Sequence, residues 1–260
     1  MDLGLKEQVV IVTGGSRGIG LAAVEAFLRE GAAVMISSIR SVSVEQAVKE
    51  LRPLGRVDGI AGDVAVEEDV VRLVSETVQR FGRLDVMVAN AGIAGKSVNL
   101  VDMDVQEWDR MQEVHLRGAF LCGREAARAM RGAGGGRIVT IASTSSYESE
   151  KLGGHYNTAK AGMLGLTRSM AVDFAEWGIR VNCVAPGWVR TDMTVDDIPA
   201  AGVPLENCGV LPRVGEPEEI ADAIVFLASG RCGFMTGETV VVDGGQLIVA
   251  PDPEAANGDG

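Results

Sequence analysis

The stretch VVIVTGGSRGIG, residues 9–20, joins a run of β-branched apolar residues to a glycine-rich turn. The apolar run is typical of a strand buried on both faces of a sheet. Gly14, Gly18 and Gly20 have G-x-x-x-G-x-G spacing, and an alanine-rich helical segment follows. Glycines here let the backbone approach a pyrophosphate, and the helix N-terminus adds free amides and a positive dipole end. The stretch therefore predicts a nucleotide-binding strand–turn–helix unit; the alternative is a plain glycine-rich turn.

The same alternation of short apolar runs and longer helical stretches continues along the chain. The predicted strands are Val9–Thr13, Ala33–Ser37, Asp58–Ala61, Leu84–Ala89, Arg137–Ala142, Arg180–Val184 and Thr239–Asp243. The predicted helices are Ile19–Glu30, Val44–Leu51, Glu67–Phe81, Asp104–Arg131, His155–Trp177 and Pro217–Ala228. Repeated strand–helix–strand alternation is typical of parallel sheets. We therefore predict the α/β class: a single doubly wound Rossmann domain, with a seven-stranded parallel sheet and helices on both faces.

The extent of this domain follows from local composition. No Pro- or Ser-rich linker divides the chain, so we predict one dinucleotide-binding domain over residues 1–250. Residues 251–260, PDPEAANGDG, have almost nothing to bury and are expected to form a disordered tail. Gly187–Arg213 has weak periodicity and three prolines, and long loops of this kind are often functional.

Composition excludes several classes of partner. The 260 residues carry 24 basic and 36 acidic side chains, and the net charge of −12 disfavours nucleic acid and anionic membranes. The cysteines, Cys122, Cys183, Cys208 and Cys232, form no C-x-x-C pair, so we expect buried thiols and no metal site. The N-terminus lacks a signal peptide, and no apolar run approaches the roughly 18 residues of a membrane span. We expect a cytoplasmic protein.

The end of the second predicted strand bears on the choice of dinucleotide. The sequence there is VMISSIRS, with Ser37 and Ser38 at the strand end and no acidic residue. A carboxylate at this place would hold the ribose hydroxyls of NAD and repel a 2′-phosphate. Arg17 and Arg40 are cations that could reach such a phosphate, although Arg40 could also be a solvated residue at a helix start. We favour NADP(H), and NAD(H) remains possible.

Both tyrosines of the chain, Tyr147 and Tyr156, precede a lysine by four positions, Lys151 and Lys160. On a helix this spacing puts a phenol and an ammonium on one face. A nearby cation would lower the phenol pKa from about 10 and make it a usable proton donor near neutral pH.

In their order along residues 5–249, these motifs resemble those of the short-chain dehydrogenase/reductase family. The matching motifs are Thr13–Gly20, Asp63, Asn90-Ala91-Gly92, Ser143, Tyr156 with Lys160, Pro186-Gly187, Thr191 and Val242–Gly245. In the family a serine precedes the reactive tyrosine by thirteen positions, which fits Ser143 and Tyr156. Tyr147 is therefore expected in a loop.

The resemblance implies a set of catalytic and cofactor-binding residues. Tyr156 would be the acid in reduction and the base in oxidation, Lys160 would lower its pKa and hold the nicotinamide ribose, and Ser143 would donate to the substrate oxygen. The expected cofactor-binding residues are Gly14, Ser16, Arg17, Gly18, Ile19, Gly20, Ser38, Arg40, Asp63, Val64, Asn90, Ala91, Gly92, Tyr156, Lys160, Pro186, Gly187, Val189 and Thr191. The alternatives are a strand-end hydroxyl for Ser143 and a solvated helix residue for Lys160.

One position departs from the family pattern. Where the family usually has Asn seven residues after a Trp, this chain has His115 after Trp108. Histidine can relay protons near neutral pH, so we expect His115 to support the proton relay; the alternative is a buried histidine that only fills the helix interior. His155 is expected at the surface or at the pocket rim.

The resemblance also implies partners and leaves the function partly open. In the family the helices that match Asp104–Arg131 and His155–Trp177 build the dimer interface and tetramers are common, so the resemblance implies a homotetramer. The small residues on these helices allow such close approach, although they could instead pack on the chain's own sheet. We expect an NADP(H)-dependent oxidoreductase acting on a small-molecule carbonyl or secondary alcohol. The alternatives are an NAD-dependent alcohol dehydrogenase of the same family and a non-catalytic dinucleotide-binding sensor. Enoyl reduction is disfavoured, because relatives with that activity usually have a longer tyrosine–lysine gap.

Overall fold

The structure, a computed structural model, describes residues 2–194 and 209–248. Within them, seven parallel strands form one sheet in the order β3-β2-β1-β4-β5-β6-β7, which confirms the predicted architecture. The strands are β1 (Val9–Thr13), β2 (Ala33–Ser38), β3 (Val57–Ala61), β4 (Val86–Ala89), β5 (Gly136–Ile141), β6 (Ile179–Pro186) and β7 (Thr239–Val242). The predicted tail 251–260 and residues 195–208 of the predicted loop lie outside the described residues.

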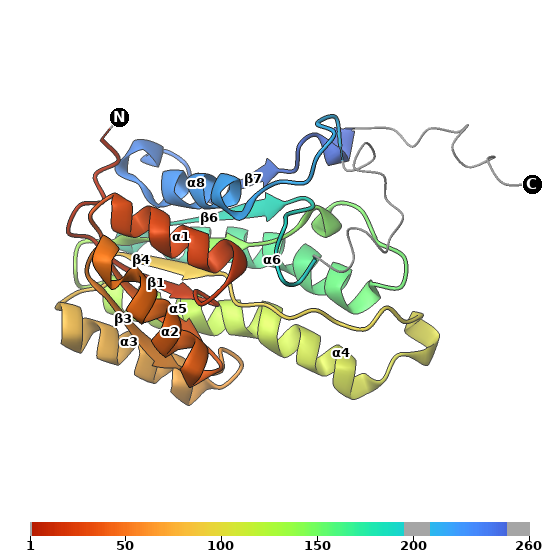
Figure 1. The fold of residues 1–260 in the computed structure, drawn as a ribbon, viewed down its shortest axis with the longest axis horizontal. Helices are drawn as coiled ribbons and strands as arrows, with labels where there is room; N and C mark the ends of the chain where they lie inside the picture. The colour runs from red at the N-terminus through yellow and green to blue at the C-terminus, as the bar shows by residue number, and fades with distance from the viewer. Residues whose placement is uncertain (1, 195–208, 249–260) are drawn as a thin grey trace, which may run out of the picture.

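Helices cover both faces of the sheet (Figure 1). They are α1 (Gly18–Arg29), α2 (Ser41–Leu51), α3 (Glu67–Phe81), α4 (Val105–Gln112), α5 (Gly118–Met130), α6 (Gly154–Asp173) and α8 (Pro217–Ala228). Single 3₁₀ turns are η1 (Arg52–Leu54), η2 (Leu100–Asp102), η4 (Thr144–Ser146), η5 (Ala175–Trp177), η7 (Gly230–Cys232) and η8 (Gln246–Ile248). Helices α1, α2 and α8 share one apolar core with the sheet, whereas α3, α5 and α6 share the other.

Local sequence signals mark where two of the helices begin or end. Helix α3 begins with three acidic residues, which suit the positive end of the helix dipole, and ends at Gly82 in the left-handed region. Helix α8 begins with Pro217 after a capping box formed by Glu216 and Glu219. Both helices have the predicted bounds.

The predicted helix Asp104–Arg131 is interrupted by a π-helical turn, η3 (Glu113–Arg117), between α4 and α5. A π turn adds one residue to a turn of the helix, so that its backbone hydrogen bonds span five residues and not four, and such turns often mark functional sites. His115 lies in this turn and is buried. The predicted helix His155–Trp177 likewise ends early, at Asp173, and continues as the 3₁₀ turn η5.

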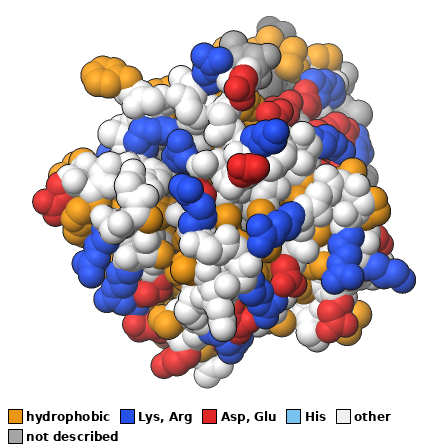
Figure 2. Space-filling view, turned by 90° about the vertical axis from the view of Figure 1, so that its left-hand side faces the viewer, with side chains coloured by type: hydrophobic (Ala, Val, Ile, Leu, Met, Phe, Trp, Pro, Cys, Tyr) orange, Lys and Arg blue, Asp and Glu red, His pale blue; other side chains and the backbone are white. Residues whose placement is uncertain are grey.

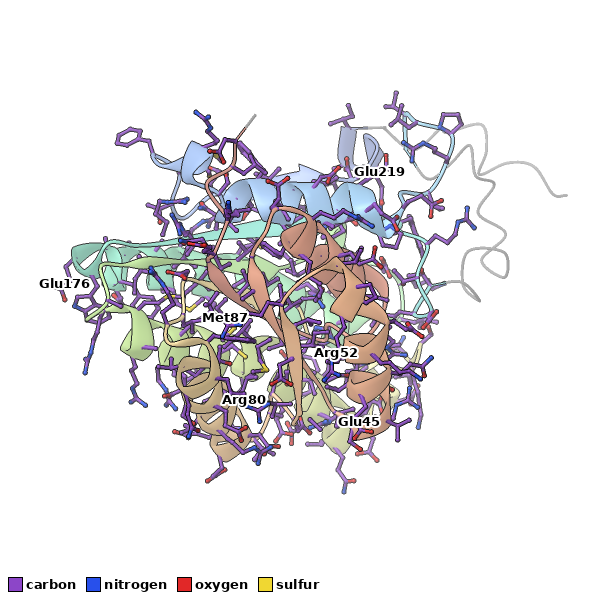
Figure 3. All side chains as sticks on the ribbon, turned by 60° about the vertical axis from the view of Figure 1, so that its left-hand side comes forward. Glu45, Arg52, Arg80, Met87, Glu176 and Glu219 are labelled. Carbon is purple, nitrogen blue, oxygen red and sulfur yellow. The ribbon has the colours of Figure 1, made fainter. Side chains whose placement is uncertain are left out.

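The interior and the surface follow the expected division of residue types. Met87 of β4 is fully buried in the interior, whereas Glu45 and Glu176 lie at the periphery (Figure 3). Figure 2 looks onto the edge of the molecule where the strands begin, and basic and acidic side chains are mixed across it. Cys122, Cys183 and Cys232 are buried free thiols. Of the helices in residues 2–194 and 209–248, none is both long and apolar enough to cross a bilayer.

The small residues of α5 and α6 divide between two environments. Ala126, Ala127 and Ala159 are buried in the chain's own core. Ala161 and Gly165 of α6 are exposed. Packing against the chain's own sheet, the predicted alternative, therefore accounts for Ala126, Ala127 and Ala159. Ala161 and Gly165 remain on the surface, where another surface could contact them.

Candidate active site

The site begins at the carboxyl end of β1, where β2 and β4 lie on opposite sides. The Oγ1 atom of Thr13 accepts hydrogen bonds from the backbone N–H groups of Asn90 and Ala91, each at 3.1 Å. The side-chain amide of Asn90 donates back to the Thr13 carbonyl at 2.9 Å. Because the connections leave the sheet in opposite directions here, a crevice opens at this point.

The structure brings most of the predicted site residues together in one cleft. The predicted residues that line it are Gly14, Arg17, Gly18, Ile19, Gly20, Ser38, Asp63, Val64, Asn90, Ala91, Gly92, His115, Ser143, Tyr156, Lys160, Pro186, Gly187, Val189 and Thr191. Ser16 and Arg40 are not among the lining residues, and Arg40 is an exposed residue directly before α2. The glycine turn has the close backbone packing that a pyrophosphate-binding turn requires, because a Cβ on Gly20 would collide with the Gly14 carbonyl.

Arg110 of α4 also lines the cleft, although it belongs to no sequence motif. Its guanidinium donates to Oδ2 of Asp63 at 2.8 Å, while Oδ1 of Asp63 accepts from the backbone N–H of Ala65 at 2.9 Å. The carboxylate of Asp63 is thus held at the cleft wall by two partners. An arginine in the middle of a helix carries no motif, so only the fold reveals this contact.

Lys160 lies one helical turn after Tyr156 on α6 and is buried. Its Nζ donates to the carbonyl of Ile141 at 2.9 Å and lies 5.5 Å from the centroid of the Tyr156 ring. Burial lowers the pKa of Lys160 to about 8. An ammonium has three protons, so those not bonded to Ile141 remain for groups in the cleft.

Burial raises the pKa of Tyr156 to about 12, the Ser143 hydroxyl lowers it, and the charge of Glu150 raises it further. The expectation that Lys160 brings this pKa below its usual value is therefore wrong for the structure as it stands. The physical reason is that a phenolate loses its hydration in the cleft, and this loss exceeds the stabilisation by the Ser143 hydroxyl. Tyr147 follows η4, outside α6, and is half exposed, as expected for a loop residue.

His115 lies against Tyr156 from the π turn. Its Nε2 lies 3.1 Å from the Ile93 nitrogen and 2.9 Å from the Ile93 oxygen. Its Nδ1 is buried without a partner among the described residues. Burial, and next the charge of Lys160, lower the pKa of His115 to about 3. The imidazole is therefore neutral at physiological pH, and any part that His115 takes in the proton relay is played by the neutral ring.

His155 is buried, and the prediction of a surface or rim position is wrong. The first turn of α6 packs beneath the loop that follows β4, where a Cβ on Gly95 would collide with the His155 ring. Gln112 of α4 donates to the His155 carbonyl at 2.9 Å and fixes the same turn. Neither ring nitrogen of His155 has a partner among the described residues.

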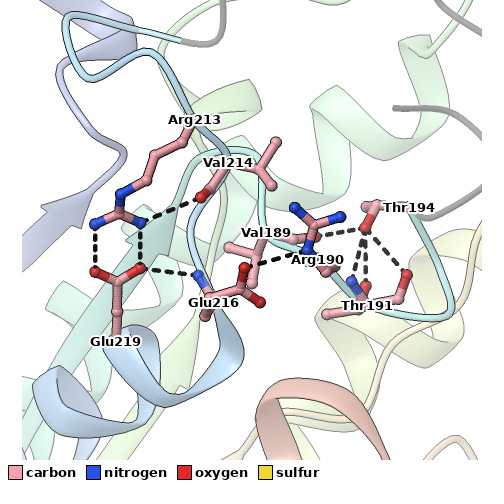
Figure 4. Close-up of polar contacts among 8 residues, drawn as sticks. All are labelled: Val189, Arg190, Thr191, Thr194, Arg213, Val214, Glu216 and Glu219. Carbon is pink, nitrogen blue, oxygen red and sulfur yellow. Dashed lines mark hydrogen bonds and ion pairs between the residues drawn. The ribbon is translucent and has the colours of Figure 1, made fainter. Parts of the chain in front are cut away.

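One ion pair joins the two chain segments on either side of residues 195–208, and another lies within the later segment (Figure 4). Arg213 donates to both carboxylate oxygens of Glu219 at 2.7 Å, and this pairing holds the Glu219 pKa at about 2. Arg190 donates to Glu216 at 3.1 Å. Thr191, which lines the cleft, directly follows Arg190, and its backbone N–H donates to Oγ1 of Thr194 at 3.1 Å.

Known proteins match this chain over nearly its whole length. A family model described as enoyl-(acyl carrier protein) reductase matches residues 14–246. A cis-4-hydroxycyclohexanecarboxylate dehydrogenase of Sinomonas cyclohexanicum is 40% identical, over 94% of this chain and 98% of that protein. A 3-oxoacyl-[acyl-carrier-protein] reductase of Synechocystis is 35% identical, over 94% and 98%.

A solved structure shows the same fold. It is a short-chain type dehydrogenase/reductase from Mycobacterium marinum, 34% identical, with a TM-score of 0.88 over 94% of this chain and 97% of that one. The cleft geometry and these matches agree on one assignment. The chain belongs to the short-chain dehydrogenase/reductase family and is an oxidoreductase acting on hydroxyl or keto groups.

Proposed function

We propose that the protein transfers a hydride between NADP(H) and a carbonyl or secondary alcohol, with Tyr156 as the general acid and base. The observation that carries the proposal is the convergence of Ser143, Tyr156 and Lys160 on the cleft that the glycine turn also lines. The serine follows β5, and the other two side chains come from α6.

Named residues of this cleft would hold the dinucleotide. The turn Gly14–Gly20 would receive the pyrophosphate at the N-terminus of α1, and the free protons of Lys160 would bind the nicotinamide ribose. When bound, the nicotinamide ring supplies or accepts the hydride at the substrate carbon. All other tasks fall to the protein's own side chains.

The phenol of Tyr156 gives a proton to the substrate oxygen during reduction and takes one during oxidation. Its raised pKa, about 12 in the protein alone, keeps it protonated and suits the donor role. Lys160 and Ser143 then supply the positive charge and the hydrogen bond that developing negative charge requires. We assign His115 a positioning role, as a neutral imidazole whose Nδ1 can hold a water near Lys160.

The preference for NADP(H) rests on the end of β2. No carboxylate lies there, and Ser37, Ser38 and Arg17 line the cleft instead. Arg17 is exposed and can move to meet a 2′-phosphate. Arg40 supports the preference for NADP(H) less than Arg17 does, because Arg40 does not line the cleft. An NAD-dependent enzyme of the same family is the alternative.

The substrate is proposed from what the relatives' names state. We propose a cyclic or acyl ketone and its secondary alcohol, since named relatives include dehydrogenases of a hydroxycyclohexanecarboxylate and of a 3α-hydroxysteroid and a 3-oxoacyl reductase. Oxidation of NADPH by 4-oxocyclohexanecarboxylate, a 3-oxosteroid and acetoacetyl-CoA tests this proposal. Crotonyl-CoA in the same panel tests enoyl reduction, which the family model's description raises. Binding of NADPH without turnover of any compound would favour the sensor instead.

We further propose a homotetramer. The exposed apolar side chains of Phe120 on α5 and Val172 on α6 support a contact through these helices. Phe226 of α8 and Val241 of β7 are also exposed and support a second contact at the β7 edge of the sheet. Light scattering at dilute concentration tests the assembly, and a monomer mass would contradict it.

A further inference from the structure

A second pocket opens at the edge of the sheet opposite the cofactor cleft. It lies at the amino ends of β1, β4, β5 and β6, on the edge that faces the viewer in Figure 2. We call it the basal pocket, and its polar side chains include those of Gln8, Arg83, Asp85, Arg137, Arg180 and Thr236. Strand β5 spans six residues, so about 20 Å separates this pocket from the strand end that precedes Ser143. None of its polar side chains belongs to a family motif or takes part in the proposed reaction.

Two arginines of the basal pocket lie side by side on neighbouring strands. Arg137 of β5 and Arg180 of β6 are paired in the parallel register, and both are half-buried. Like charges at paired positions of neighbouring strands destabilise a sheet. Burial, and next the charge of Arg180, lower the pKa of Arg137 below its usual value. The pair therefore holds two mutually repelling guanidinium groups at the same place.

The acidic side chain among the described lining residues, Asp85, is already engaged. Its Oδ1 accepts from Nε and Nη2 of Arg83 at 2.9 and 2.5 Å, and its Oδ2 accepts from the backbone N–H of Val9 at 2.8 Å. One carboxylate against three guanidinium groups leaves two positive charges at the basal pocket. This local excess is opposite in sign to the net charge of the chain, −12.

Arg180 is held in place by uncharged acceptors. It donates to three backbone carbonyls, those of Leu227, Ser229 and Met235, at 3.4, 2.9 and 3.3 Å. These contacts fix the position of the guanidinium and leave its charge without a counterion. A half-buried charge without a partner of opposite sign is unfavourable, and a bound anion would relieve it.

Arg137 has hydrogen-bond donors to spare. Within the described part of the chain its guanidinium makes one hydrogen bond, from Nη1 to Oε1 of Gln8 at 2.8 Å. A guanidinium has five N–H donors, so the remaining four can bind a ligand. Oγ1 of Thr236 accepts from the backbone N–H of Val181 at 3.1 Å, which leaves its own proton for the pocket.

We propose that the basal pocket binds a small oxyanion of the phosphate class, with Arg137 as its main ligand and with Arg83 and Thr236 as further donors. A phosphate dianion matches the two excess positive charges, and its oxygens suit the planar fork of an arginine. The proposal is independent of the hydride-transfer reaction, because the pocket and the cofactor cleft lie at opposite ends of the strands. Loss of phosphate binding here is therefore expected to leave turnover unchanged.

Calorimetric titration of the protein with inorganic phosphate tests the proposal. Gln8→Glu is the most informative variant, since it keeps the shape of Gln8 and puts a carboxylate within hydrogen-bond distance of Arg137. We expect it, and likewise Arg137→Gln, to weaken phosphate binding at least about tenfold, because each removes a charge-assisted contact. Arg52→Gln, at an exposed arginine of η1, is the matched control and should bind phosphate as the wild type does.

Phosphate could also enter the cofactor cleft at the turn Gly14–Gly20, and Arg17→Ala separates the two sites. This variant removes a cation of the cleft and should keep the phosphate binding that Gln8→Glu loses. Thermal unfolding gives a second measurement. Relative to sodium chloride at equal ionic strength, phosphate should raise the Tm of the wild type more than that of Gln8→Glu. Without phosphate, Gln8→Glu should have the higher Tm, because it supplies the missing negative charge.

Three results would overturn the proposal. They are an absence of phosphate binding in the wild type, phosphate binding in Gln8→Glu and Arg137→Gln as tight as in the wild type, and an equal loss in Arg52→Gln. Loss of phosphate binding in Arg17→Ala alone would place the anion in the cofactor cleft and would also contradict the proposal. A wild type that binds no phosphate, together with a smaller assembled mass of Arg137→Gln in light scattering, would make the occupant a second copy of this chain.

Discussion

The imidazole of His115 stands edge-on to the phenol of Tyr156, with ring centroids 5.4 Å apart and ring planes at 87°. The contact joins the π turn between α4 and α5 to the first turns of α6. Edge-to-face packing of this kind fixes the orientation of both rings. His115 therefore acts on the tyrosine as a buried, neutral neighbour that holds it in place.

The buried imidazole predicts a specific loss of stability in acid. The unfolded chain binds a proton at His115 below pH 6.5, whereas the folded chain does so only near pH 3. The contribution of the neutral His115 to the free energy of unfolding is thus complete above pH 6.5 and is lost as the pH falls toward 3. Between pH 7 and pH 4.5 we expect the free energy of unfolding of the wild type to fall by about 2–3 kcal/mol more than that of His115→Asn.

Urea unfolding of both proteins at the two pH values measures this difference. Any destabilisation by the asparagine that does not depend on pH lowers the free energy of unfolding equally at both pH values. It therefore cancels in the difference between them. Equal pH dependence in the two proteins would show that His115 is not buried in its neutral form.

The glycine turn predicts a steric requirement at Gly20. A Cβ there would lie within 2.8 Å of the Gly14 carbonyl carbon and 2.6 Å from Nδ2 of Asn90. Gly20→Ala should weaken NADPH binding at least about tenfold and destabilise the fold by about 1–3 kcal/mol, because backbone has to move. Gly132→Ala is the control, since a Cβ at Gly132 meets nothing within 4 Å and should change stability by no more than about 0.5 kcal/mol. Fluorescence titration and thermal unfolding measure both effects.

The arginines near the end of β2 predict cofactor preference. Arg17→Ala should raise the Kd for NADPH by about tenfold and leave the Kd for NADH nearly unchanged, because only NADPH carries the 2′-phosphate. Arg40→Ala should have a smaller effect, since Arg40 does not line the cleft. Ser38→Asp should reverse the preference toward NADH. A wild type that binds NADH more tightly than NADPH would refute the assignment.

Local signals in the sequence predicted much of this fold. The predicted bounds of α3 and α8 match the structure because acidic first turns, a proline and a glycine mark their ends. Strand β1 is predictable because it reads as a continuous apolar run, and it is buried at all five positions. The relevant information in these cases lies within a few residues of the element itself.

The features that the sequence did not predict depend on contacts between distant segments. The π turn at His115 looks like an ordinary helical stretch, and the burial of His155 depends on the loop after β4. Arg110 and Glu150 carry no motif, and only the fold brings them to Asp63 and to Ser145, respectively. The raised pKa of Tyr156 is not predictable from the sequence for a similar reason, because helical spacing shows a neighbouring cation and not the loss of solvent.

The central claim is that the phenol of Tyr156 carries the proton in hydride transfer, and Tyr156→Phe tests it most directly. The measurement is NADPH oxidation with the carbonyl panel, together with the Kd for NADPH, in the wild type and in this variant. We predict that kcat falls by about 10²–10⁴-fold while the Kd changes less than about threefold, since only the proton donor is removed. Turnover by the variant at the wild-type rate would contradict the account.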